Sequence, residues 1–176
     1  MPTLIVFCHL RWDFVFQRPQ HLLTRLARHY RIVIVEEPMH DPQGPARLER
    51  GSPLPNITVC RPRTPIDVPG FHDDQIALVA PLLADLLPAS VRPIVWFYTP
   101  MALPLLQSLP ASLVVYDCMD ELAAFDFAPP DLGENEAALI AALDRADEIM
   151  AEVDIFEHQQ PPAEAVEAAD RQAKGL

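Results

Sequence analysis

Five short apolar runs, each about as long as a β-strand, constrain what this chain can fold into. Most are rich in Val, Ile or aromatic residues, a composition typical of buried strands. The runs lie at residues 4–8, 31–38, 56–62, 93–100 and 112–116. Stretches with helical spacing or helix-start residues follow most of them, at about residues 19–30, 72–87, 100–109 and 134–145. This alternation predicts an α/β fold: a Rossmann-like, doubly wound parallel sheet of five to six strands in a single domain.

The length of the chain and its composition indicate how it is organised. With 176 residues, half of them hydrophobic, the chain is long enough for one domain with its own core. We expect that domain to span residues 1–147, with an irregular loop over residues 39–55, which are rich in Pro and Gly. Residues 148–176 are acidic and weakly patterned, so we expect a divergent tail with an edge strand over residues 148–153 and, past Pro162, either a loose helix or a disordered segment.

The charge of the chain limits which partners it could bind, and its cysteines indicate the compartment in which it works. The net charge of −12 argues against a nucleic-acid partner. Residues 1–35 nevertheless carry five arginines and one aspartate, and this basic end could meet a phosphate-bearing ligand or anionic lipid; a solvated helix face is the alternative. The three cysteines form no Cys-x-x-Cys pair, which predicts free thiols in a reducing compartment. Because the sequence shows no leader and no membrane-spanning run, we expect a cytoplasmic protein whose membrane contact, if any, is peripheral and at the inner face.

The expected strand order brings several polar side chains to one edge of the sheet. In a doubly wound sheet the order reverses beside the first strand, and a crevice opens there at the carboxyl ends of strands one and four. The loops after strands one, four and five would line that crevice. Their candidate residues are His9, Arg11, Trp12, Asp13, Gln17, Arg18, Tyr98, Thr99, Asp117, Asp120 and Glu121. We expect these side chains to converge on one binding site.

Two groups among them suggest specific chemistry, each with a plainer alternative. Pro19 at the first turn of the first helix leaves backbone N–H groups free for an anion, and Arg18 adds positive charge; the alternative is an ordinary helix start with a surface arginine. The acids Asp117, Asp120 and Glu121 could bind a metal, act as a general base or hold sugar hydroxyls. Alternatively, Asp120 caps a helix and Asp117 pairs with a nearby arginine.

Other candidates also allow two interpretations. His9 directly follows a strand and could transfer protons near neutral pH, or it could be a hydrogen-bonded structural group. Trp12 could stack on a sugar ring or cap the core. The five glycines form no G-x-G-x-x-G or G-x-x-x-x-G-K arrangement, so a phosphate cradle of bare backbone is not expected.

Several blocks of the sequence together resemble the N-terminal half of bacterial GT-B glycosyltransferases, in particular the teichuronic-acid and exopolysaccharide types of families 1 and 4. The blocks are HLRWD at residues 9–13, FQRPQHL at 16–22, VEEP at 35–38, WFYTP at 96–100 and YDCMDE at 116–121. The likeness covers about residues 3–147, and QRPQH is its most specific part. It implies a Rossmann-like acceptor-binding domain, half of a GT-B fold. A second such domain would hold the nucleotide sugar, which is a substrate, so neither a cofactor nor a metal is implied.

The resemblance also implies roles for particular residues. Asp13, Asp117 or Asp120 would orient or deprotonate an acceptor hydroxyl, and Arg18 would neutralise a phosphate on the donor or on a lipid-linked acceptor. The donor-binding signature, two Glu eight positions apart, has no match in the chain, and the family pattern ends near residue 148. We therefore expect a truncated transferase that is inactive unless a separate chain supplies the donor domain.

Two other hypotheses fit the same residues. One is a non-catalytic remnant or binding module of the same fold. The other is a small regulatory domain that uses the aspartate cluster in the manner of a receiver. The regulatory domain lacks the expected acidic pair after strand one, where Asp13 is the available acid.

Overall fold

The computed structural model describes residues 1–84 and 86–118, together with Glu134 and Ala137. The chain divides into two compact units, Met1–Leu143 and Asp144–Leu176, and everything described below belongs to the first. The predicted tail over residues 148–176 lies outside the described residues, as do Asp120 and Glu121. Of the helix predicted over residues 134–145, Glu134 and Ala137 are described, and both are helical.

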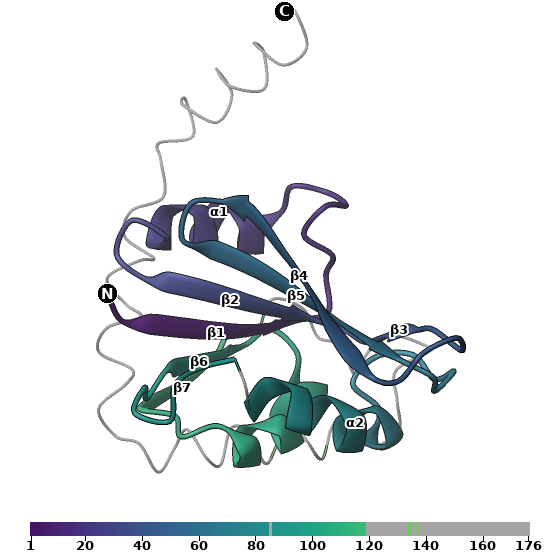
Figure 1. Cartoon of the computed structure of the whole chain (residues 1–176). Coiled ribbons are helices and arrows are strands. Elements are labelled where there is room, and N and C mark those ends of the chain that lie inside the picture. Colours follow the sequence, from purple (N-terminus) through teal and green to yellow (C-terminus); the bar gives the residue numbers. More distant parts are fainter. Residues whose placement is uncertain (85, 119–133, 135–136, 138–176) are drawn as a thin grey trace, which may run out of the picture. The chain divides into compact units, whose positions relative to one another are not determined.

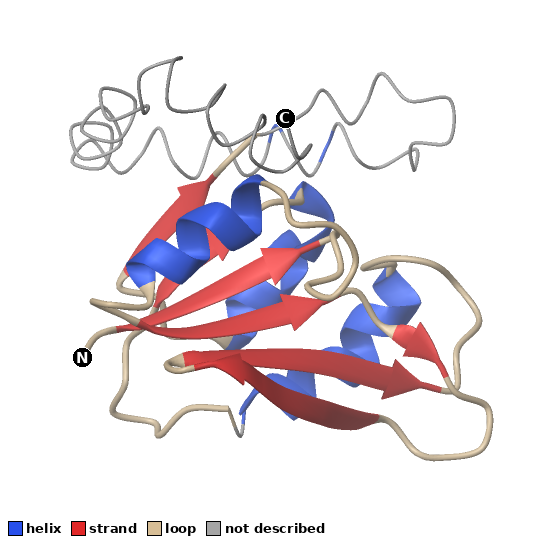
Figure 2. Cartoon of the chain, turned by 90° about the horizontal axis from the view of Figure 1, so that it is seen from above, coloured by secondary structure: helices blue, strands red, loops and turns tan. Residues whose placement is uncertain are grey.

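Seven strands in the described part form one sheet in the order β3-β5-β2-β1-β6-β7, with β4 also paired to β5. The strands are β1 (Thr3–Cys8), β2 (Arg31–Glu36), β3 (Met39–His40), β4 (Arg47–Leu54), β5 (Ile57–Thr64), β6 (Ile94–Phe97) and β7 (Leu113–Tyr116). All pairings in this sheet are parallel except that of β4 with β5. The sheet is drawn in red in Figure 2. The predicted fold class, an α/β protein with a Rossmann-like parallel sheet, is confirmed.

Helices cover both faces of the sheet (Figure 1). Helix α1 (Arg18–Leu26) lies on one face, where its Leu23 packs in a cluster with Leu4 and Val6 of β1. Helix α2 (Asp73–Ala84) and the 3-10 helix η1 (Pro100–Ser108) lie on the other face, where Leu83 packs with Phe7. All six residues of β1 are buried, because successive side chains of a strand point to opposite faces and both faces are covered.

The irregular loop predicted over residues 39–55 is wrong, because β3 and β4 lie within it. Strand β4 pairs antiparallel with β5, from Arg47 opposite Arg63 to Leu54 opposite Ile57, with a register shift after Gly51. Its residues are exposed or half-buried, so the apolar pattern that identifies buried strands is missing. Charged residues, Gly and Pro are tolerated there because β4 lies at the edge of the sheet, where the outer backbone groups need no partner strand.

The reversal of strand order falls where the sequence predicts it. Strand β1 pairs with β2 on one side and with β6 on the other, so successive connections from β1 lead in opposite directions across the sheet. The carboxyl ends of β1 and β6 therefore mark the position at which doubly wound proteins usually bind ligands. The loop over residues 9–17 leaves this edge, and Tyr98 and Asp117 each directly follow a strand that ends there.

Candidate functional site

An ion pair joins two of the candidate residues across the switch point. Arg18, the first residue of α1, donates from Nη2 to Oδ1 of Asp117 at 2.9 Å, although 99 positions separate the two in sequence. The Arg18 side chain is 65% exposed, whereas that of Asp117 is 9% exposed. Asp117 is held at the end of β7 because its backbone N–H donates to the carbonyl of Phe97 at 2.9 Å. The pairing of Asp117 with an arginine, one of the two roles considered for it, is therefore present.

Tyr98 adjoins this pair beneath the surface. Its side chain is buried in the cluster on the α1 side of the sheet, and its backbone N–H donates to the carbonyl of Phe7 at 2.9 Å. Burial, and next the charge of Asp117, raise the pKa of Tyr98 well above its usual range. Burial also raises the pKa of Asp117, and the guanidinium of Arg18 offsets part of that effect. Tyr98 is therefore neutral and can donate a proton in a hydrogen bond.

Asp117 also interacts with Tyr98 at this position. Both Asp117 Oδ2 and Tyr98 Oη are buried, and among the described residues neither meets a partner in hydrogen-bond geometry. The two groups are nevertheless close enough that a hydrogen-bonding interaction between them contributes to the pKa of each. The carboxylate of Asp117 is therefore held from two sides, by the guanidinium of Arg18 and by the hydroxyl of Tyr98.

A second group of polar residues surrounds Glu36, at the end of β2. The side chain of Glu36 is fully buried and accepts hydrogen bonds from Arg11 Nη1 at 3.3 Å, from the backbone N–H of Trp12 at 2.7 Å and from Arg61 Nε at 2.8 Å. Arg61, on β5, also pairs with Asp13. Arg11 donates in addition to the backbone carbonyl of Glu37 at 2.6 Å. The candidates Arg11, Trp12 and Asp13 are thus brought together around Glu36.

The first turn of α1 fixes the shape of the loop over residues 9–17. Gln20 is buried, and its Nε2 donates to the carbonyl oxygens of Val15 at 2.9 Å, of Trp12 at 3.2 Å and of Arg11 at 3.5 Å. Its Oε1 accepts the backbone N–H of Gln17 at 3.0 Å, at the start of the helix. The buried amide therefore replaces the backbone partners that an irregular loop lacks.

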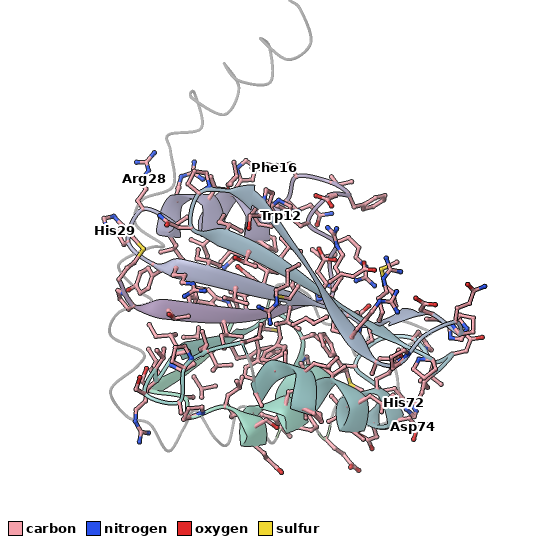
Figure 3. All side chains as sticks on the ribbon, in the orientation of Figure 1. Trp12, Phe16, Arg28, His29, His72 and Asp74 are labelled. Carbon is pink, nitrogen blue, oxygen red and sulfur yellow. The ribbon has the colours of Figure 1, made fainter. Side chains whose placement is uncertain are left out.

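The remaining candidates have positions that suit structural roles. The hydroxyl of Thr99 is buried and accepts the backbone N–H of Met101 at 3.4 Å, which caps η1. Trp12 is half-buried and packs against the cluster that contains Tyr98, so it covers the core as one of its two interpretations predicts. Figure 3 shows Trp12 on the same side of the sheet as α1. His9 is half-buried immediately after β1, and Gln17 is exposed.

Sequence reasoning missed three residues that build this edge: Glu36, Arg61 and Gln20. Glu36 carries the clearest signal, since it is an acid at the end of an apolar run predicted to be buried, and a buried carboxylate requires partners. Gln20 belongs to the QRPQH block, but nothing in the pattern indicates that its amide turns into the core. Arg61 lies in β5, and nothing in the neighbouring residues indicates that it contacts Glu36.

The described residues hold no cluster of three or more His, Cys, Asp or Glu side chains that could bind a metal ion. None of the helices within these residues is both long enough and apolar enough to cross a bilayer.

Comparisons of the chain with known protein families, with curated proteins and with solved structures find no match. The fold therefore defines a class: an α/β protein with a mostly parallel, Rossmann-like sheet. No family within that class is identified.

Proposed function

We propose that this chain contains the acceptor-binding half of a nucleotide-sugar-dependent glycosyltransferase. The observation that carries the proposal is the ion pair of Arg18 with Asp117, placed over the buried Tyr98 at the switch point of the sheet. This arrangement offers a mostly exposed cation beside a carboxylate whose side chain is 9% exposed. Such a pair suits a substrate that carries both a phosphate and a hydroxyl group.

The chemistry of Asp117 fits a role on an acceptor hydroxyl. A general base works best when its pKa approaches the operating pH, and burial shifts the pKa of Asp117 in that direction. The carboxylate of Asp117 would accept the proton of the acceptor hydroxyl while Arg18 holds a neighbouring phosphate. Asp13 is less suited to this role, because its carboxylate is paired with Arg61 and exposed. Asp120, the third acid with an expected catalytic role, and Glu121 lie outside the described residues.

A non-catalytic binding module of the same fold is the second candidate. It is favoured by the partners of the acids, because Asp117 pairs with Arg18 and Asp13 pairs with Arg61. In a binding module these pairs would hold the loops in place and select a ligand without turnover. Sugar transfer to an acceptor, when a donor-binding domain and a nucleotide sugar are supplied, would favour the enzyme over the module.

Ligand titration of the purified full chain tests the proposal. Glucose 1-phosphate presents the phosphate and sugar hydroxyls expected of an acceptor, whereas UDP-glucose, which the donor domain would mainly hold, should bind more weakly. Isothermal calorimetry measures both affinities. Arg18→Ala should weaken binding at least about tenfold, because it removes a hydrogen bond between charged groups. Asp117→Asn should weaken it as well, since a neutral amide holds the guanidinium less strongly than a carboxylate does.

The control is Arg25→Ala, on the same helix, whose guanidinium donates to the carbonyl of His21 at 2.7 Å. It should bind both ligands as the unmodified chain does. The proposal fails if neither ligand binds, or if Arg25→Ala weakens binding as much as Arg18→Ala does.

A further inference from the structure

Three consecutive apolar side chains stand out from the surface of the loop between β1 and α1. Phe14, Val15 and Phe16, here called the aromatic tip, are 80%, 48% and 59% exposed. The other large apolar side chains exposed in the described residues are Met1, at the chain start, and Leu54. Single exposed apolar residues are ordinary, but a contiguous aromatic patch usually marks a surface that contacts something else.

The fold holds the aromatic tip outward. The backbone N–H of Phe14 donates to the carbonyl of Arg11 at 3.3 Å, and the buried amide of Gln20 holds the carbonyl of Val15 at 2.9 Å. The ring of Phe16 meets the ring of His21 edge to face, with centroids 4.5 Å apart. Exposure of these side chains therefore follows from the hydrogen bonding of the loop.

Exposed arginines follow the aromatic tip along α1 and at the start of β2. Arg25, Arg28 and Arg31 are all exposed, and residues 14–35 contain no Asp or Glu. This concentration of positive charge occurs in a chain whose net charge is −12. Figure 3 shows Phe16 and Arg28 on the α1 side of the sheet, whereas His72 and Asp74 lie on the opposite side.

We propose that the aromatic tip and the exposed face of α1 dock on the surface of an anionic lipid bilayer. Aromatic side chains favour the interfacial region of a membrane, and arginines beside them can meet the lipid phosphates. Charge complementarity favours this occupant over a second copy of the chain, because two copies meeting through this face would bring their arginines together. This inference is independent of any transferase activity, since it rests on surface chemistry outside the Arg18–Asp117 pair.

Vesicle co-sedimentation of the purified full chain tests the inference. The chain should bind vesicles of phosphatidylcholine with added phosphatidylglycerol, and should bind vesicles of phosphatidylcholine alone much more weakly. High salt should weaken the binding. Phe14→Ser/Phe16→Ser should reduce the affinity at least about tenfold, because two aromatic rings no longer enter the interface. Arg25→Gln/Arg28→Gln should reduce it roughly 25-fold, from about fivefold for each arginine.

Two matched controls separate this surface from general effects. Leu54→Ser removes an exposed apolar side chain from β4, and Arg92→Gln removes an exposed arginine just before β6. Both should bind anionic vesicles as the unmodified chain does. Circular dichroism and thermal melting establish that all variants fold, which is expected because every substituted side chain is exposed.

A spectroscopic measurement gives a second, independent readout. The chain has two tryptophans, and Trp12 lies two positions before the aromatic tip. In a Trp96→Phe background, Trp12 emission should shift to the blue when anionic vesicles are added. The inference is overturned if the chain binds no vesicles, or if the aromatic-tip variant binds as the unmodified chain does. It is also overturned if that variant only breaks a dimer of this chain, which would make a second copy the occupant.

Discussion

Replacing Glu36 by Gln is the sharpest test of how the candidate site is held together. The carboxylate of Glu36 is fully buried and joins the loop after β1 to strand β5. Its Oε2 accepts both Arg11 and Arg61, and its Oε1 accepts the backbone N–H of Trp12. Gln has nearly the same shape, so the substitution removes the charge and one acceptor without creating a cavity.

The expected cost follows from these three contacts. A hydrogen bond to a charged group contributes about 1.5–3 kcal/mol, and whichever way the new amide turns, its NH₂ group faces a donor. Arg11 and Arg61 are 34% and 29% exposed and can recover part of their hydration, which lowers the cost. We expect the free energy of unfolding to fall by about 2–4 kcal/mol. For a chain of this length, that corresponds to a decrease in melting temperature of roughly 5–15 °C.

Glu49→Gln is the matched control for this prediction. Glu49 also contacts two arginines, Arg63 at 2.9 Å and Arg47 at 3.6 Å, but its side chain is 44% exposed. Exposed ion pairs contribute little, so this variant should lose less than about 1 kcal/mol. Urea denaturation of both variants measures the difference. If Glu36→Gln costs no more than Glu49→Gln, the buried carboxylate does not hold the loop, and the assembly described here is incorrect.

Three further predictions concern stability. Burial raises the pKa of Glu37 to about 7, and the charge of Arg11 opposes this shift. The folded chain should therefore lose up to about 3 kcal/mol of stability as the pH rises from about 4.5 to 7. Glu37→Gln should remove this loss, which melting curves across the same pH range would detect. Gly70→Ala should cost about 1–2 kcal/mol in urea denaturation, because φ is +69° and the new Cβ would lie 3.3 Å from Glu37 Oε1. Asn56→Ala should cost about 2 kcal/mol by the same assay, because φ is 62° and the hydrogen bond to the carbonyl of Ala27 is lost.

The strands in the middle of the sheet could be predicted because buried strands consist mainly of apolar residues. Strands β1 and β2 are buried on both faces, so each reads as a continuous apolar run. Their alternation with helices then limits the topology and places the switch point beside β1. Strand β4 was not predicted because backbone pairing with β5 holds it in place. Its side chains are mostly exposed, so they show no apolar pattern.

The partners of the site residues were harder to predict than the edge on which they lie. Parallel strand ends fix which loops share that edge, and this brings Arg18 and Asp117 into reach of each other. Whether Arg11 turns toward Glu36 or toward Tyr98 depends on side-chain orientation, which strand spacing does not determine. The Arg61 contact requires β5 to lie beside β2, a neighbour relation that only the complete strand order supplies.

Gln20 links the two proposed surfaces, and replacing it by Ala tests whether they depend on one loop. Its amide holds the carbonyl of Val15 in the aromatic tip and the N–H of Gln17 beside Arg18. Without it, three loop carbonyls lose a partner, which should cost about 2–3 kcal/mol and let the loop depart from its position. Gln20→Ala should therefore weaken the binding of both glucose 1-phosphate and anionic vesicles, whereas Arg25→Gln/Arg28→Gln should weaken vesicle binding alone. A folded Gln20→Ala variant that binds both as the unmodified chain does would show that the two surfaces do not depend on the buried amide.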